Sequence, residues 1–420
     1  MNRFKAIPVQ LSALLIVCCC AGKVHAQNVT SPYSILGIGD IDNRDAGRYF
    51  ITGSSGISRR DANYNFSNPA SLTAIPFKVM NMDMGFNGRV SSFKVPGSDS
   101  LLPKTKDFVV RRVSVAFKAG NKTGIAFGLK PYSTMSYKFE QDRIILDGNT
   151  SYNKLIDGNG GINQAYFSAG HALSKHLSIG ITGSWLFGAL QRTTSYSSSS
   201  IDLAITREDR DFYNAGMVLG GVQYYTQGKN WKHQFGLTGS ISSDLKGQLT
   251  TEYFENSVSV QKNIDNNRSF RLPVTVGFGY AAVYKNVITI TTQAEYQYWR
   301  SQAVDYTRSY TDPALRLSGG MEFALKPNKY SSVNDRPFIG WGFNAEQSYL
   351  RIKDQPLWDY SVSFGGGMPL FRNVSVYSGI SGGIKGNYAK GLIREKYTQF
   401  VFALTLRDIW IGTKKFGRYD

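Results

Sequence analysis

The chain has 420 residues and a formal net charge of +18, from 48 Lys and Arg against 30 Asp and Glu. Its mean hydropathy of −0.26 is too low for a bundle of membrane-spanning helices. All three cysteines, Cys18 to Cys20, lie near the N-terminus, so a disulfide framework and a thiolate metal site are excluded elsewhere. The basic excess raises nucleic acid as a partner. No basic helix or nucleic-acid-binding motif accompanies this basic excess, so we expect no nucleic-acid partner.

The N-terminus has the features of a secretory signal. Arg3 and Lys5 supply the positive start, Leu11–Cys20 the apolar core, and Val24-His25-Ala26 a small-residue cleavage site before Gln27. The apolar core is too short for a membrane-spanning helix. Cys18 follows Ile16-Val17 rather than a small residue, which favours ordinary cleavage over lipidation. We therefore expect residues 1–26 to be removed on export to the outer membrane of a Gram-negative cell.

Residues 27–76 differ in composition from the rest of the chain. They are rich in Gly, Asn, Asp, Ser and Arg and show no strict period. A disordered tail is one interpretation. The scattered apolar residues, such as Leu36, Phe50, Ile51 and Ile57, instead favour a compact plug that packs against something.

From Phe77 onward, apolar and polar residues alternate with period 2. In Val287–Trp299, Ile288, Ile290 and Tyr296 share one face, while threonine and glutamine residues occupy the other. Such segments number about fourteen, an even count as in bacterial outer-membrane barrels. They are 77–94, 107–119, 122–139, 161–173, 176–193, 209–226, 232–254, 268–283, 287–300, 314–326, 337–350, 358–369, 374–388 and 396–411.

The connections between these segments alternate in length. Short turns such as Gly120-Asn121, Ser174-Lys175 and Lys285-Asn286 belong on the periplasmic side. The long polar stretches 95–106, 140–160, 194–208, 255–267 and 301–313 are expected as external loops. The fold class expected is an all-β transmembrane antiparallel barrel over residues 77–412, with a periplasmic tail over 413–420. A soluble sandwich or propeller is the alternative, but the strands are long for soluble sheets and no blade-length repeat is present.

Two motifs are similar to signatures of catalysis and of metal binding. Gly379-Ile380-Ser381-Gly382-Gly383 matches G-x-S-x-G, but it lies in an alternating strand without the following helix that a nucleophile elbow needs. Asp157-Gly158-Asn159-Gly160 resembles part of a calcium loop, although an Asx-Gly turn in an external loop explains it better. We therefore expect no enzyme activity, no catalytic residue, no metal and no cofactor.

One segment before the first strand carries a family resemblance. The run Phe66-Ser67-Asn68-Pro69-Ala70-Ser71-Leu72-Thr73 resembles the Asn-Pro-Ala segment of FadL-like long-chain fatty acid transporters. The resemblance implies a fourteen-stranded barrel, an N-terminal hatch in its lumen, and a third strand kinked inward to leave a lateral gap. Gly128 to Ser133 is similar to the segment at that kink, and Pro131 beside Tyr132 cannot donate to a strand ladder.

Two features depart from the family pattern. The chain continues past the last aromatic strand positions into Thr413–Asp420, whereas such barrels commonly end on an aromatic residue. The opening run Ser31–Asp40 is richer in glycine than the hatch of the best-known fatty acid transporter. Both departures are compatible with a specialised branch of the family.

Two functions are compatible with this resemblance. The first is passive uptake of a hydrophobic small molecule, in which the hatch moves near Asn68-Pro69-Ala70 and the ligand leaves at the gap near Pro131 and Tyr132. The second is a partner subunit of an outer-membrane machine for type IX secretion or protein assembly. Expected partners are outer-membrane lipid and lipopolysaccharide, a hydrophobic ligand, and other outer-membrane subunits.

Four arginines in the hatch are candidates for binding a fatty acid carboxylate. They are Arg44, Arg48, Arg59 and Arg60. A fatty acid needs an apolar slot for its tail and a cation or donor for its carboxylate, and the hatch supplies both kinds of residue. The alternative is that these arginines pair with Asp or Glu in the lumen and hold the plug in place.

Overall fold

The computed structural model describes residues 31–97, 104–146, 150–198, 203–305, 308–325, 336–371 and 373–409. The expected signal segment 1–26 and the expected tail 413–420 lie outside these ranges. No helix in the described ranges is long and apolar enough to span a membrane.

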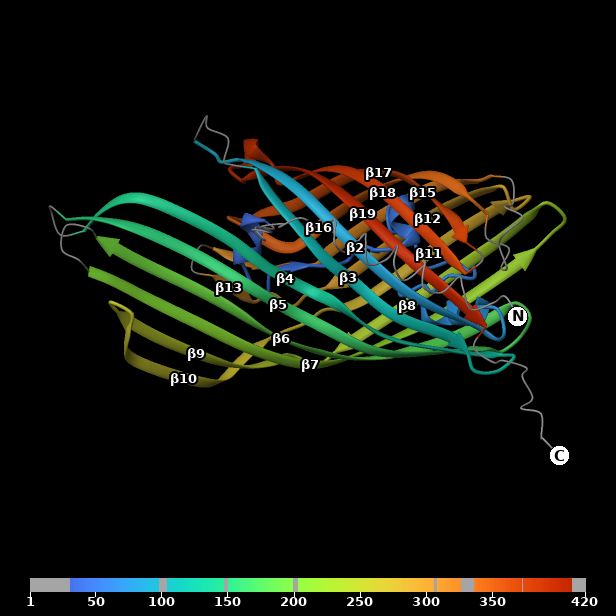
Figure 1. The fold of residues 1–420 in the computed structure, drawn as a ribbon, viewed down its shortest axis with the longest axis horizontal. Helices are drawn as coiled ribbons and strands as arrows, with labels where there is room; N and C mark the ends of the chain where they lie inside the picture. The colour runs from blue at the N-terminus through green and yellow to red at the C-terminus, as the bar shows by residue number, and fades with distance from the viewer. Residues whose placement is uncertain are drawn as a thin grey trace, which may run out of the picture.

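Fourteen antiparallel strands form a closed barrel, which confirms the predicted fold class (Figure 1). Pairing of the last strand with the first, from Arg394 opposite Lys94 to Ile409 opposite Val79, closes the wall. The wall strands are β2 (Val79–Lys94), β3 (Thr105–Lys118), β4 (Thr123–Leu146), β5 (Thr150–Ala172), β6 (Leu177–Ser198), β7 (Leu203–Gln227), β8 (Trp231–Ser242), β11 (Val274–Tyr284), β12 (Ile288–Tyr298), β15 (Ala314–Ala324), β16 (Phe338–Ile352), β17 (Gln355–Phe371), β18 (Val374–Lys385) and β19 (Arg394–Ile409).

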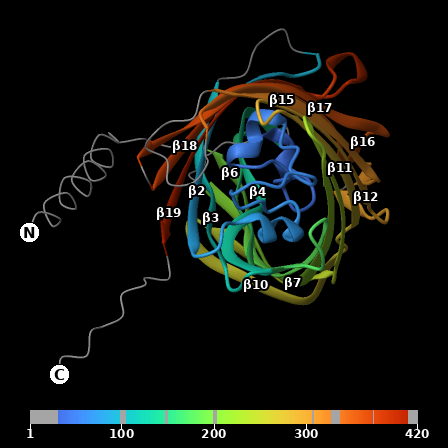
Figure 2. The ribbon, with the colours of Figure 1, turned by 90° about the vertical axis from the view of Figure 1, so that its right-hand side faces the viewer.

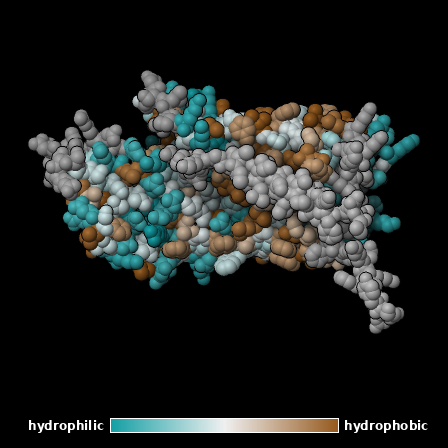
Figure 3. Space-filling model, viewed as in Figure 1, coloured by the Kyte–Doolittle hydropathy of each residue, from teal (hydrophilic) through white to brown (hydrophobic). Residues whose placement is uncertain are grey.

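Side chains alternate between the two faces of this wall. On β17, Val362 is 62% exposed and Phe364 58%, whereas the alternating residues Ser361 and Ser363 are buried against the lumen. Hydrophobic residues gather over the half of the barrel near the short turns, and hydrophilic residues dominate the opposite end (Figure 3). An apolar band with a polar interior is the pattern of a barrel that contacts lipid with its outer face.

The prediction of external loops is wrong for three stretches, because strands continue through them. The β4–β5 ladder extends to Leu146 opposite Thr150, and the β6–β7 ladder to Ser198 opposite Leu203. Residues 255–267 fall largely in a further hairpin of β9 (Leu245–Glu255) and β10 (Val258–Phe270). Outside the apolar band both faces of a strand meet polar surroundings, so the ladder continues without the alternation that reveals it in the sequence.

The same correction applies to two smaller segments. Asp157–Gly160 lies within β5 and not in an Asx-Gly turn. The stretch 301–313 contains the short strands β13 (Ala303–Asp305) and β14 (Ser309–Thr311). The motif Gly379–Gly383 lies inside β18, as its alternation indicates.

Residues 31–78, which we call the inner segment, run inside the barrel (Figure 2). They form short 3-10 helices η1 (Pro32–Ile35), η2 (Arg48–Thr52) and η3 (Pro69–Ala74), and the short strand β1 (Asp40–Ile41). A fourth 3-10 helix, η4 (Tyr388–Lys390), lies between β18 and β19. Apolar residues of the inner segment such as Ile51 and Leu72 are fully buried. The segment is therefore packed, as its apolar content indicates.

Wall glycines allow the backbone of the inner segment to approach the barrel closely. A Cβ atom on Gly342 of β16 would collide with the backbone of Thr52 and Gly53. A Cβ on Gly180 of β6 would collide with Pro69 and Ala70. These glycines are thus required by packing between the inner segment and opposite sides of the wall.

We predict that Gly342→Ala destabilises the barrel, because the added methyl has only backbone atoms to displace. Overpacking of this kind costs about 1–3 kcal/mol. Denaturant unfolding in detergent, followed by tryptophan fluorescence, measures the change. Gly216→Ala is the matched control, since a Cβ there meets nothing within 4 Å. Equal stability of the two variants would contradict the role given to Gly342.

Candidate functional site

The Asn68-Pro69-Ala70 motif begins η3 and attaches it to the wall. The Asn68 Oδ1 accepts a hydrogen bond from the Ala70 N–H at 3.0 Å, and Pro69 occupies the first helical position, where no N–H is needed. The Asn68 Nδ2 donates to the Ile57 carbonyl at 2.9 Å and to the Val222 carbonyl of β7 at 3.2 Å. In this structure the motif caps a helix and anchors the inner segment.

The four arginine candidates all have partners within the protein. Arg44 Nη2 lies 2.8 Å from Asp359 on β17. Arg48 and Arg59 reach Glu322 on β15 at 3.1 and 2.8 Å.

Arg60 is held differently. It donates to Thr73 at 2.7 Å and Ser178 at 3.1 Å and lies over the Tyr225 ring. For three of the arginines, pairing with lumenal acids is the arrangement observed. A role for any of the four in binding a ligand carboxylate stays a prediction.

A buried charge cluster forms around Glu322. Asp61 of the inner segment lies 3.3 Å from Arg59 and 3.6 Å from Arg48, and the Tyr49 hydroxyl donates to Asp61 at 2.9 Å. Burial alone would raise the pKa of the Asp61 carboxyl, but the neighbouring guanidinium groups of Arg48 and Arg59 hold this pKa below its usual range. The side chain of Glu322 is only 3% exposed. Two cations and two carboxylates therefore neutralise each other at a site where Glu322 and Arg59 are fully buried and Asp61 is partly exposed.

The wall ladder is interrupted between β3 and β4. Their pairing ends at Val113 opposite Leu129, although β3 begins at Thr105 and β4 continues to Leu146. Figure 1 shows the two strands diverging beyond this point. A register shift against β5 falls between Pro131 and Ser133, where proline cannot donate. The backbone carbonyl of Tyr132 accepts a hydrogen bond from the Asp42 N–H of the inner segment at 2.9 Å.

Residues Asp40–Asp45 of the inner segment connect the two separated strands, and we call them the bridge. On one side, β1 pairs with β4, with Asp40 opposite Thr134 and Ile41 opposite Ser133. On the other side, Asp42 lies 3.3 Å from Arg111 and Asp45 lies 2.7 Å from Arg112, both on β3. These ion pairs were not predicted from the sequence. Their signals there are the closely spaced Asp40, Asp42 and Asp45 and the adjacent Arg111-Arg112.

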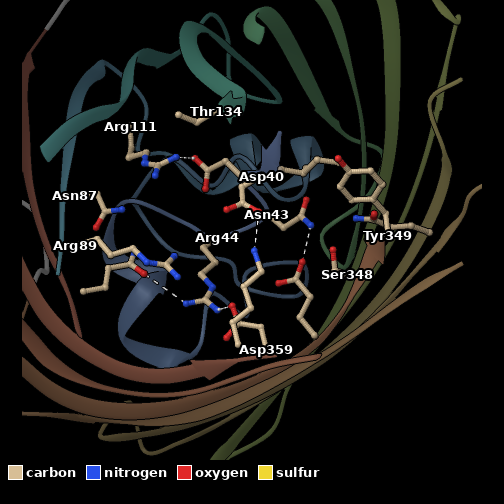
Figure 4. A pocket seen from close by; sticks show the side chains of 16 residues that line it. Asp40, Asn43, Arg44, Asn87, Arg89, Arg111, Thr134, Ser348, Tyr349 and Asp359 are labelled. Carbon is tan, nitrogen blue, oxygen red and sulfur yellow. Dashed lines mark hydrogen bonds and ion pairs between the residues drawn. The ribbon is translucent and has the colours of Figure 1, made fainter. Parts of the chain in front are cut away.

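A small cavity beside the bridge is lined by charged and amide side chains (Figure 4). Its volume is about 90 Å³, whereas ligand pockets usually measure about 300–1,000 Å³. Lys385 pairs with Asp40 at 2.6 Å, and Arg89 pairs with Glu395 at 2.6 Å. The cavity therefore suits water and ion pairs and gives no slot to a long alkyl chain.

An apolar groove lies on the other side of the wall, where the β3–β4 ladder ends. Its lining includes the exposed side chains of Val113, Phe127, Leu129, Phe167 and Trp185. Its volume is about 810 Å³. Because these residues point outward from the barrel, the groove opens toward lipid.

Comparison with known proteins identifies the family. The BamG family model matches residues 9–417. The chain belongs to the BamG family. No curated protein matches this BamG-family chain.

Solved structures with a similar fold are outer-membrane channels. The Pseudomonas putida toluene transporter TodX is 14% identical, with a TM-score of 0.58 over 89% of this chain and 100% of its own. A Pseudomonas aeruginosa FadL homologue is 8% identical, with a TM-score of 0.59 over 89% and 100%. The Ralstonia pickettii toluene transporter TbuX is 11% identical, with a TM-score of 0.51 over 86% and 98%. At these identities the likeness establishes a FadL-like fold for this BamG-family barrel.

We predict that Glu322→Gln strongly destabilises the attachment of the inner segment. The change leaves Arg48 and Arg59 buried with only Asp61 as a carboxylate partner, and breaking a buried pair costs about 3 kcal/mol or more. Denaturant unfolding in detergent and protease sensitivity of residues 31–78 measure the effect. The control is Glu140→Gln, which breaks an exposed pair with Lys138 worth less than about 1 kcal/mol. Similar losses in both variants would contradict the prediction.

Proposed function

We propose that this BamG-family barrel is a rigid partner subunit of an outer-membrane protein machine, of the kind that secretes or assembles outer-membrane proteins. The observation that carries the proposal is the attachment of the inner segment to the wall on all sides. A subunit of this kind needs a fixed shape and does not need a passage through its lumen.

The attachment points are distributed around the circumference of the barrel. They are Asp45 to Arg112 of β3, Asn68 to Val222 of β7, Gly56 to Gln293 of β12, Arg59 to Glu322 of β15, Arg44 to Asp359 of β17, and Ser31 to Glu395 of β19. Several of these are buried charge pairs, and separating one partner from the other is strongly unfavourable. Movement of the inner segment would break several of them together.

The polar end of the barrel offers a surface for other subunits. Strands β4 to β7 continue beyond the apolar band, and β9 and β10 add a hairpin beside them. Side chains from Val258 to Ser269 on β10 are exposed. The pocket on this extension is small, about 160 Å³, and charged residues such as Glu208, Arg210 and Lys262 line it. A sheet of this kind that extends past the membrane supports contact with macromolecules in preference to capture of a hydrophobic small molecule.

A second candidate is uptake of hydrophobic compounds through the wall. It is supported by the end of the β3–β4 ladder, by the apolar groove beside it, and by the fold shared with hydrocarbon channels. In this candidate the bridge moves, and a ligand passes between β3 and β4. The two candidates differ in whether the inner segment must move.

A disulfide between the inner segment and the wall separates the candidates. The hydroxyl oxygens of Ser55 and Thr291 lie 2.6 Å apart, so Ser55→Cys with Thr291→Cys is placed to form a bond in a mature chain that has no other cysteine. We expect the oxidised variant to assemble with its partners as the wild type does. Native gels of gently solubilised membranes measure the assembly, and uptake of a labelled long-chain fatty acid is measured in parallel.

Ser168→Cys with Thr182→Cys is the matched control, because it joins β5 to β6 and leaves the inner segment free. Loss of assembly only in the oxidised Ser55–Thr291 variant would contradict a rigid subunit. Protein-dependent uptake that this bond stops and a reductant restores would establish the second candidate instead.

The uptake candidate makes a separate prediction for the bridge. Asp42→Asn with Asp45→Asn removes the carboxylates that hold Arg111 and Arg112, so the bridge loosens and fatty acid entry rises. Asp354→Asn is the control at an exposed turn away from the bridge. Uptake equal to that of the wild type in the double variant would count against a path between β3 and β4.

A further inference from the structure

The short turns at one end of the barrel carry exposed lysines. Lys122, Lys175, Lys229 and Lys285 lie in the turns that follow β3, β5, β7 and β11. Those four turns contain no acidic residue. Short turns belong to the periplasmic side of such barrels, so these lysines form a basic rim at the periplasmic mouth. We call these four residues the lysine rim.

Charges at the opposite end of the barrel are arranged differently. Some basic residues there pair with acidic neighbours, for example Lys138 with Glu140 at 2.9 Å and Arg207 with Asp209 at 3.0 Å. Within the described ranges, no lysine of the rim has a carboxylate within ion-pair distance. The acidic residue Asp408 is also exposed at this end, but it lies on β19 rather than in a turn. The rim is thus a patch of one sign.

The rim lies at the level of the lipid headgroups. Trp231 is 42% exposed and lies two positions from Lys229, and its ring is 4.7 Å from that of Tyr284, the neighbour of Lys285. Aromatic residues of this kind mark the membrane interface. At about 3.3 Å per strand residue, Lys229 and Lys285 lie a few ångströms beyond that interface, inside a headgroup layer about 6 Å deep. Lys122 and Lys175 lie in the equivalent short turns.

We propose that the lysine rim binds the phosphate groups of anionic phospholipids in the periplasmic leaflet. A compact lysine ammonium on a flexible stem recognises a phosphate as a point charge. The four turns are spread along the strands from β3 to β12, and Lys78 and Arg336 continue the basic edge on either side. An annulus of lipid contacts such a rim along its whole length, whereas a docked protein would cover one arc. The proposal is independent of the function proposed above.

The test is retention of a defined lipid by the full-length protein. Protein purified in a mild detergent is mixed with phosphatidylglycerol, cardiolipin or phosphatidylethanolamine, and bound lipid is counted by native mass spectrometry. We expect the variant with Lys122, Lys175, Lys229 and Lys285 all changed to Gln to lose about tenfold or more in phosphatidylglycerol and cardiolipin binding. Binding to the wild type should also weaken as salt is raised.

A matched variant changes the same number of charges at the other end. It carries Gln at Lys262, Lys353, Lys390 and Lys396, which are all exposed. It should keep wild-type lipid binding. Equal loss in both variants, equal binding of phosphatidylethanolamine, or unchanged lipid binding in the rim variant would overturn the proposal. Loss of an acidic protein from native complexes of the rim variant, with lipid binding unchanged, would assign the rim to a protein partner instead.

Discussion

Charged groups enclosed by a barrel must be neutralised within it, and this constraint organises the molecule. The inner segment brings Arg44, Arg48 and Arg59 into the lumen, and the wall supplies Asp359 and Glu322 to meet them. At the interrupted strand pair the signs are reversed, because Asp42 and Asp45 come from the inner segment and the arginines from β3. Because an unpaired charge in a protein interior is far more costly than a paired one, the partners fix where the inner segment lies.

The close approach of the inner segment's backbone to the wall makes those short ion pairs possible. A wall with side chains at every inward position would hold the inner segment too far away for short ion pairs. At glycines such as Gly180 and Gly342 the wall has no side chain, and the backbones of η3 and of the end of η2 approach there. The glycine content and the lumenal charges therefore belong to one arrangement. The bridge extends this arrangement to the wall, because it supplies β4 with a backbone partner where β3 leaves it.

Whether a feature could be predicted depended on how far apart in the sequence the interacting residues lie. Alternation of apolar residues is a local signal, and it gave the strands inside the lipid band, such as β12, and their number. It failed for the polar ends of β4 to β7, where no lipid selects an apolar face. The helix cap by Asn68 is also a local feature, and the Asn-Pro sequence is a signal for it. The partners of the arginines were not, since Glu322 lies 263 residues from Arg59 and Asp359 lies 315 residues from Arg44. No spacing in a single sequence encodes such pairs, which exist only after the barrel closes.

The resemblance to FadL-like transporters favours a channel, whereas the contacts in the lumen favour an inner segment that stays in place. A transporter needs an apolar route with a weakly held obstruction, because a ligand must displace it with its own binding energy. Here the route beside the bridge is lined by charges, and the obstruction is held by several buried pairs. A hydrophobic ligand that forms no charged contacts would have to offset their rupture with apolar contacts alone. The same barrel can thus share the fold of a channel while its interior makes the wall rigid, and this supports the proposed role as a subunit among other proteins.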